Sequence, residues 1–130
     1  MTNPNFIQIQ SEYALWLDTL GFSRGVVYQY PKRINDFLEW LHTQGISQIN
    51  QLNQKHIESY FKHLQTRPHK RRKGALLSAS SLNDNFIAVD KLLEFLQQQG
   101  AQNTPTPTNY RINPDKNERI YKIETLTQSE

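Results

Sequence analysis

The chain has 130 residues, of which 36% are hydrophobic and 21% charged, so its length fits one domain with a modest core. It contains no cysteine, which excludes disulfide scaffolds and thiolate metal sites and agrees with a cytoplasmic location. The first residues, MTNPNFIQIQSEY, have neither a basic region nor a long apolar run. We therefore expect neither secretion nor membrane insertion.

The net charge of +3 is concentrated in one segment. Residues 1–66 hold five basic and five acidic groups, and residues 74–130 hold five basic and seven acidic groups. Residues 67–73, RPHKRRK, hold five basic groups and no acidic one. Such a run is typical either of a surface that binds phosphates or of a solvated loop, and both interpretations stay open here. No amphipathic helix with a basic face adjoins it, which argues against a membrane surface.

The first half of the chain predicts two helices. Apolar residues recur at three- and four-residue spacing before Gly21, which is expected to end the first helix in a left-handed conformation. The stripe consists of Phe6, Ile9, Tyr13, Trp16, Leu17 and Leu20. Ser23 is the expected N-cap of the second helix, Pro31 is expected to kink it, and Gly45 closes it. Its expected buried positions are Val27, Tyr30, Ile34, Phe37, Leu38 and Leu41.

Two further helices follow. The third is expected to start at Asn53 and to end before Pro68, because the residue before proline disfavours helical geometry. Its apolar positions are Ile57, Tyr60, Phe61 and Leu64. The fourth begins near Ser78 and stops at Gly100. Its expected buried positions are Leu82, either Asn85 or Phe86, Val89, Leu92, Leu93 and Leu96. No segment alternates with period two, so we assign no sheet.

The composition changes after Gly100. The run AQNTPTPTNYRINPDKN holds three prolines and many small polar residues, so we expect a linker that does not pack. The last four residues, Thr127 to Glu130, match a capping box that starts a helix, either by chance or as the opening of another domain. The expected division is therefore a helical domain over residues 1–100 and a linker with the start of another domain over residues 101–130.

Catalytic motifs are not found in this sequence. It has no glycine-rich phosphate loop, no nucleophile elbow and no HExxH pair. The histidines, His42, His56, His63 and His69, lack the spacing of metal ligands and are interpreted as solvent-facing or hydrogen-bonded. We expect no catalytic residue, metal, cofactor or small-molecule substrate in this chain.

Polar faces on the second and fourth helices are the stronger signal of function. The second helix carries its cations and amide on its amino-terminal half, at Arg24, Gln29, Lys32 and Arg33. The fourth helix shows Ser80, Asn83, Ile87 and Lys91 on its expected outer side. Asn83 has the chemistry to read an adenine edge, and Ile87 fits a thymine methyl group. The alternative is that these side chains simply solvate the two helices.

The pattern G-x-S-x-x-[TV]-[IV]-x-x-Y-x-x-x-[LI]-x-x-F-L-x-W-L, from Gly21 to Leu41, resembles the amino-terminal core-binding (SAM-like) domain of tyrosine recombinases, the phage-integrase family. The motif L-S-x-x-S-L-N, from Leu77 to Asn83, is similar to the start of that domain's fourth helix. Leu126, Thr127 and Glu130 resemble the L-T-x-x-E opening of the catalytic domain. The resemblance covers residues 5–130.

The resemblance implies an all-α, four-helix SAM-like bundle with a flexible C-terminal tail. Such a bundle clamps one face of recombination-site DNA, in DNA integration and recombination, while a catalytic domain holds the other face. The implied partners are double-stranded DNA and other recombinase protomers. Because the family's catalytic residues lie in its second domain, we expect this chain to bind DNA without cleaving it, and none of its tyrosines is assigned as the nucleophile.

The expected contacts with DNA come from the two helices and the basic run. They are Arg24, Gln29, Lys32, Arg33, Lys70, Arg71, Arg72, Lys73, Ser80, Asn83, Ile87 and Lys91. Asp84 and Asp90 stand where family members often place arginines, and we expect them to repel phosphate from the fourth helix. The alternative function is a protein-protein interaction module that does not bind DNA and uses Phe6, Trp16 and Leu20 of the first helix.

Overall fold

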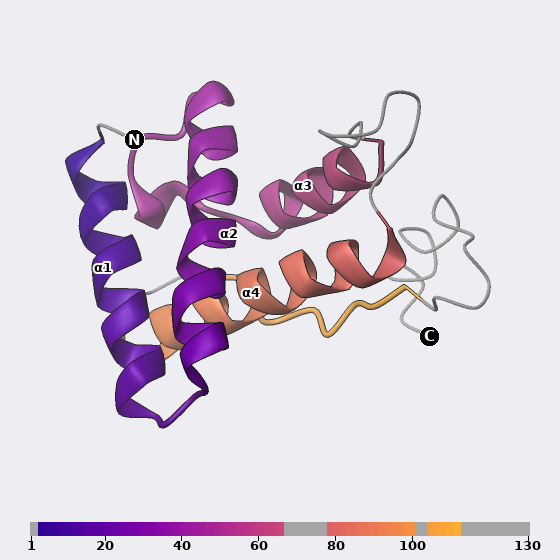
Figure 1. Cartoon of the computed structure of the whole chain (residues 1–130). Helices are drawn as coiled ribbons and strands as arrows, with labels where there is room; N and C mark the ends of the chain where they lie inside the picture. The colour runs from indigo at the N-terminus through magenta and orange to yellow at the C-terminus, as the bar shows by residue number, and fades with distance from the viewer. Residues whose placement is uncertain (1–2, 67–77, 101–103, 113–130) are drawn as a thin grey trace.

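The computed structural model describes residues 3–66, 78–100 and 104–112, and within these ranges it contains four α-helices and no strand. The helices are α1 (Pro4–Thr19), α2 (Arg24–Thr43), α3 (Gln54–Thr66) and α4 (Ala79–Gln98). A short 3-10 turn that the sequence did not predict, η1 (Ile49–Gln51), joins α2 to α3. The prediction of an all-α, four-helix bundle is confirmed (Figure 1).

The ends of the two long helices follow from local chemistry, as predicted. The hydroxyl of Ser23 accepts a hydrogen bond from the Val26 amide at 3.3 Å, and Ser78 caps α4 through the Ser81 amide at 3.1 Å. Gly45 follows the end of α2 with φ +84° and Gly100 follows the end of α4 with φ +79°. These left-handed conformations favour glycine, so each helix stops where the sequence indicates.

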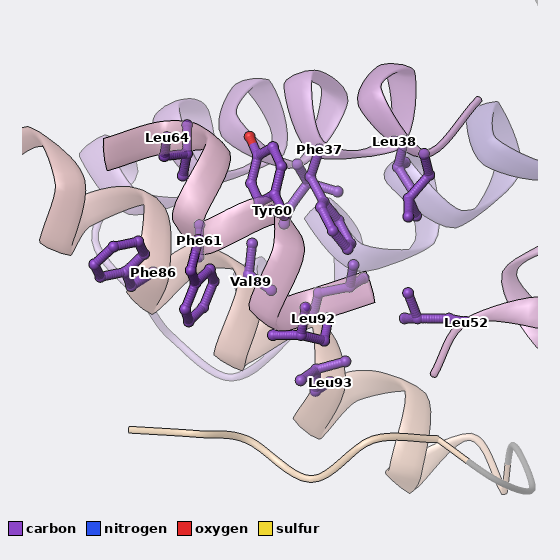
Figure 2. Close-up of a cluster of buried hydrophobic side chains, with 14 of the residues drawn as sticks. Phe37, Leu38, Leu52, Tyr60, Phe61, Leu64, Phe86, Val89, Leu92 and Leu93 are labelled. Carbon is purple, nitrogen blue, oxygen red and sulfur yellow. The ribbon is translucent and has the colours of Figure 1, made fainter. Parts of the chain in front are cut away.

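The core lies where α1, α2 and α3 meet α4. α1 and α2 run antiparallel side by side, and α3 and α4 lie across them (Figure 1). The Tyr13 hydroxyl of α1 donates a 2.9 Å hydrogen bond to the Ala88 carbonyl of α4. Phe61 of α3 lies against Phe86 of α4 with ring centroids 4.3 Å apart, near Val89 (Figure 2). α4 is thus the central helix, and few of its side chains are left for an outer face.

The structure places Leu20 at the end of α1 and Pro31 within α2. Leu20 was expected on the buried stripe of α1, and this is wrong: it is the C-cap residue and 55% of it is exposed. The apolar stripe therefore ends at Leu17, which is fully buried. Pro31 lies inside α2, which continues as one helix from residue 24 to residue 43, and its carbonyl accepts a 2.9 Å hydrogen bond from the side chain of Gln10.

The expectation that the chain after Gly100 does not pack is wrong for residues 104–112, which we call the strap. The strap has no regular secondary structure and follows α4 back toward its amino-terminal end (Figure 1). Tyr110 is only 6% exposed and Ile112 only 1%. The Tyr110 ring lies 5.3 Å from that of Phe86, so the strap extends the core instead of leaving it.

A buried carboxylate holds the strap in place. Asp90, on α4, is 2% exposed and accepts hydrogen bonds from the amides of Thr108 and Asn109, each at 2.9 Å. The Arg111 guanidinium forms an ion pair with the same carboxylate at 3.0 Å. Asn109 adopts φ +56°, a left-handed conformation that asparagine tolerates better than most residues. The strap therefore belongs to the folded bundle, whereas the other residues assigned to the linker and tail lie outside the described ranges.

Candidate nucleic-acid interface

The outer side of α2 carries a row of long polar side chains. Arg24, Tyr28 and Lys32 are spaced four residues apart, so they lie on one side of the helix, and all three are exposed. Gln29, also exposed, lies beside them. Within the described part of the chain, neither Arg24 nor Lys32 forms an ion pair with a carboxylate. Both positive charges of this row are thus available to an anionic partner.

Arg33 has a different environment from the other cations of α2. Its side chain is only 27% exposed, and its Nη2 atom lies 3.7 Å from Oδ2 of Asp84 on α4. Its Nε atom is buried and has no hydrogen-bond partner among the described residues. The charge of Arg33 is therefore partly compensated, and the ion pair joins the outer sides of α2 and α4 into one surface.

Tyr30 of α2 lies near this ion pair. Burial raises the pKa of its phenol, the Asp84 carboxylate raises it further, and the charges of Arg33 and Arg111 oppose that rise. Two cations and one anion, from α2, α4 and the strap, therefore lie close enough to act on a single hydroxyl group. The strap thus brings the positive charge of Arg111 near Tyr30.

The outer side of α4 is less cationic than that of α2. Ser80 is exposed, whereas Ile87 and Lys91 are half-buried. Lys91 Nζ lies 5.4 Å from the ring centroid of Phe22, which precedes α2, and 3.4 Å from Oε2 of Glu94. Since helix neighbours three and four apart share a side, Ile87 lies between Asp84 and Lys91 and beside α2. This side of α4 offers one hydroxyl, one apolar side chain and a cation that is already paired.

The structure overturns the outward placement of Asn83 and Asp90. The side-chain amide of Asn83 donates to the Ile112 carbonyl at 2.8 Å and accepts from the Ile112 amide at 2.7 Å. Asp90 is buried under the strap, so the prediction that it repels phosphate from an outer face is wrong. Both residues follow the spacing of the α4 core positions, because Asn83 lies three residues before Phe86 and Asp90 lies four after it. Of the two aspartates expected on the outer side of α4, Asp84 and Asp90, only Asp84 remains on the candidate surface.

The basic run of residues 67–73 lies outside the described residues, and with it the predicted contacts Lys70, Arg71, Arg72 and Lys73. The capping-box match at residues 127–130 lies outside them as well. In the sequence the basic run follows Thr66, the last residue of α3, and its last residue, Lys73, precedes Ser80 by seven positions.

Three further findings concern His56, metal sites and membrane spans. The Nδ1 atom of His56 accepts a hydrogen bond from the Asn53 amide, while the Asn53 side chain accepts one from the His56 amide, so His56 helps to cap α3. Among the described residues, no group of three histidine, cysteine, aspartate or glutamate side chains has the arrangement of a metal site. None of the described helices is both long and apolar enough to cross a bilayer.

Comparison with known proteins agrees with the four-helix fold. The family described as phage integrase, N-terminal SAM-like domain, matches residues 14–100. Tyrosine recombinase XerS of Lactococcus lactis subsp. cremoris strain MG1363 is 25% identical over 123 residues, which cover 83% of this chain and 34% of the relative. XerS of strain SK11 gives the same identity and coverage. The chain thus spans about a third of the length of these curated relatives. No solved structure gives a significant match.

Proposed function

Because this chain belongs to the family of N-terminal SAM-like domains of phage integrases, we propose that it binds double-stranded DNA through the joined outer sides of α2 and α4. Family membership implies a role in DNA recombination. The observation that carries the DNA-binding proposal is the row on α2, where Arg24 and Lys32 are exposed and have no carboxylate partner in the described part of the chain. Phosphates are the ligands that such cations contact on a duplex.

The proposed contacts divide between phosphate and base edges. Arg24, Lys32 and Arg33 would contact phosphates, with Gln29 and Lys91 beside them, and Lys70, Arg71, Arg72 and Lys73 would extend this set. Ser80 and Ile87 would lie nearest to base edges, since one can form a hydrogen bond and the other fits a methyl group. Asn83 would reach a base only after releasing the Ile112 backbone.

In this proposal the chain forms half of a clamp around recombination-site DNA and acts in integration and recombination together with other recombinase protomers. Its own residues bind and orient the duplex and perform no strand cleavage. Incubation with labelled duplex, followed by denaturing electrophoresis, tests this point, since a covalent DNA adduct on this chain would overturn it. A cytoplasmic location stays a prediction.

Fluorescence anisotropy of a labelled duplex, titrated at about 50 and 200 mM salt, tests the DNA-binding proposal. Replacing Lys32 by methionine, or Arg24 by glutamine, removes one phosphate contact, so the salt slope should flatten by about 0.9 for each change. Lys55→Met, at an exposed position on α3, is the matched control and should leave the slope unchanged. Binding that is indifferent to salt, or equal slopes for all variants, would contradict the proposal.

Exposed apolar side chains on α1 favour the alternative of a protein-interaction module. Leu15 is 65% exposed, Leu20 55% and Ile7 41%. Of the three residues first expected to form this surface, Phe6 is fully buried. Trp16 is partly buried, and its indole donates to the side chain of Gln98. Only Leu20 is exposed. Sedimentation of the chain with and without DNA separates the two functions, because this alternative requires self-association, or association with another protein, that does not depend on DNA.

A further inference from the structure

Tyr28 is the member of the α2 row that no expectation from the sequence included. It is 61% exposed, although a tyrosine that only stabilises the fold is usually packed. It lies between Arg24 and Lys32 on the same side of the helix, one turn from each. Its ring therefore stands within the surface that we propose for DNA binding.

Tyr28 and Lys32 contact each other directly. Nζ of Lys32 lies 2.7 Å from the phenol oxygen and 4.0 Å from the ring centroid. An ammonium group has no acceptor, so the lysine donates and the phenol oxygen accepts. The phenol proton is then directed away from Lys32, and the ammonium group keeps two further donors. The pair thus offers solvent at least two kinds of donor and a positive charge, all within one helical turn.

We propose that Tyr28 and Lys32 act as one unit that binds a single DNA backbone phosphate, with Tyr28 donating its hydroxyl proton and holding the ammonium group of Lys32 in place. This inference rests on the proposed function and adds a residue and a mode of binding to it. A free lysine side chain loses much rotamer freedom when it is fixed on a partner. A lysine already held by a neighbour loses less, so the same contact binds more tightly.

The electrostatics of the pair agree with this role. The hydrogen bond from Lys32, followed by its charge, lowers the pKa of the Tyr28 phenol. A more acidic hydroxyl is a stronger donor to an anion, and hydrogen bonds to charged groups are stronger than neutral ones. Within the described residues no carboxylate is paired with Lys32, so an incoming phosphate would not have to displace one.

The test is a double-mutant cycle on DNA affinity with Tyr28→Phe, Lys32→Met and the double variant. Tyr28→Phe removes only the hydroxyl group, so the affinity should fall about three- to tenfold while the salt slope stays unchanged. Lys32→Met should flatten the slope by about 0.9. The double variant should lose less than the product of the two single losses, because each change removes part of the same contact. Since both side chains are exposed, all variants should keep the wild-type melting temperature.

The outcomes separate this inference from the proposed function. If Lys32→Met and Arg24→Gln flatten the slope while Tyr28→Phe binds like the wild type, DNA binding stands and the phosphate unit is refuted. If the loss of affinity in the double variant equals the product of the two single losses, the phosphate unit is also refuted. If the affinity for DNA does not depend on salt and no variant changes it, the proposed function itself fails. A duplex of arbitrary sequence is a sufficient probe, because phosphate contacts carry no base information.

Discussion

Replacing Asp90 by alanine should lower the free energy of unfolding by about 3 kcal/mol, since removing one partner of a buried ion pair typically costs about 3–5 kcal/mol. The Asp90 side chain is 3% exposed and accepts hydrogen bonds from Thr108, Asn109 and Arg111. The donors are the amide and hydroxyl of Thr108, the amide of Asn109 and the guanidinium of Arg111. Each hydrogen bond to a charged group contributes about 1.5–3 kcal/mol, so four would sum to about 6–12 kcal/mol if their donors stayed buried. The expected loss is smaller than that sum.

The expected loss of stability is smaller because the strap can detach from α4. When the carboxylate is gone, the strap can leave α4, and the two amides, the Thr108 hydroxyl and the guanidinium regain water. The variant then loses the free energy of docking the strap, not the sum of the hydrogen bonds. Arg111 is already 35% exposed and needs little rearrangement to reach solvent. These considerations place the expected loss at the lower end of the range for buried pairs.

Urea denaturation combined with amide hydrogen exchange measures this effect. Asp84→Ala is the matched control, because Asp84 lies on the same helix but is 48% exposed and pairs with Arg33 only at 3.7 Å. Such a pair contributes about 0–1 kcal/mol. The amides of Thr108 and Asn109 should lose protection in Asp90→Ala and keep it in Asp84→Ala. Equal stability of the two variants, or unchanged protection of the strap, would refute the reasoning.

The remaining predictions concern the surface, the core and alkaline pH. Asp84→Asn should raise DNA affinity about threefold at low salt and less at high salt, because it removes an anion beside Arg33; an affinity that stays constant in anisotropy titrations would argue against this surface. Leu17→Ala should cost about 2–5 kcal/mol in urea denaturation, since Leu17 is fully buried. Leu20→Ala should cost less than about 1 kcal/mol, and similar losses at the two positions would contradict the observed end of the stripe. Burial raises the pKa of the Tyr13 phenol, so the folded chain keeps a proton that the unfolded chain loses above pH of about 10. Stability should therefore be complete below that pH and fall above it by up to about 1.4 kcal/mol per pH unit, and Tyr13→Phe should weaken this dependence.

The helix ends could be predicted because they depend on neighbours in the sequence. Ser23 caps α2 through an amide three residues ahead, and Gly45 stops it by its own backbone conformation. Neither interaction depends on where the other helices lie. The same holds for the row on α2, whose members are related only by helical spacing. Tyr28 could therefore have been found from its position four residues from both Arg24 and Lys32.

The strap could not be predicted by the same means, because its composition resembles that of a linker and its contacts come from a distant helix. A signal did exist on α4. Asp90 lies four residues after Phe86 and three before Leu93, so it continues a buried stripe. A carboxylate at such a position requires buried hydrogen-bond donors. The backbone amides in the middle of α4 cannot supply them, because they already donate to carbonyls of the same helix. The missing donors are the amides and the guanidinium of a segment about twenty residues later.

The strap also changes how much each of the two long helices can contribute to the proposed DNA binding. On α4, Asn83 and Asp90 hold the strap, while the acids Asp84 and Glu94 lie beside the cations Arg33 and Lys91. On α2, Arg24 and Lys32 form no ion pair with a carboxylate in the described part of the chain, although Asp36 lies one turn after Lys32. Removing a cation from α2 should therefore change the salt dependence of binding. Changes at Ser80 or Ile87 of α4 should instead alter the preference among DNA sequences and leave that salt dependence intact, because neutral side chains release no counterions.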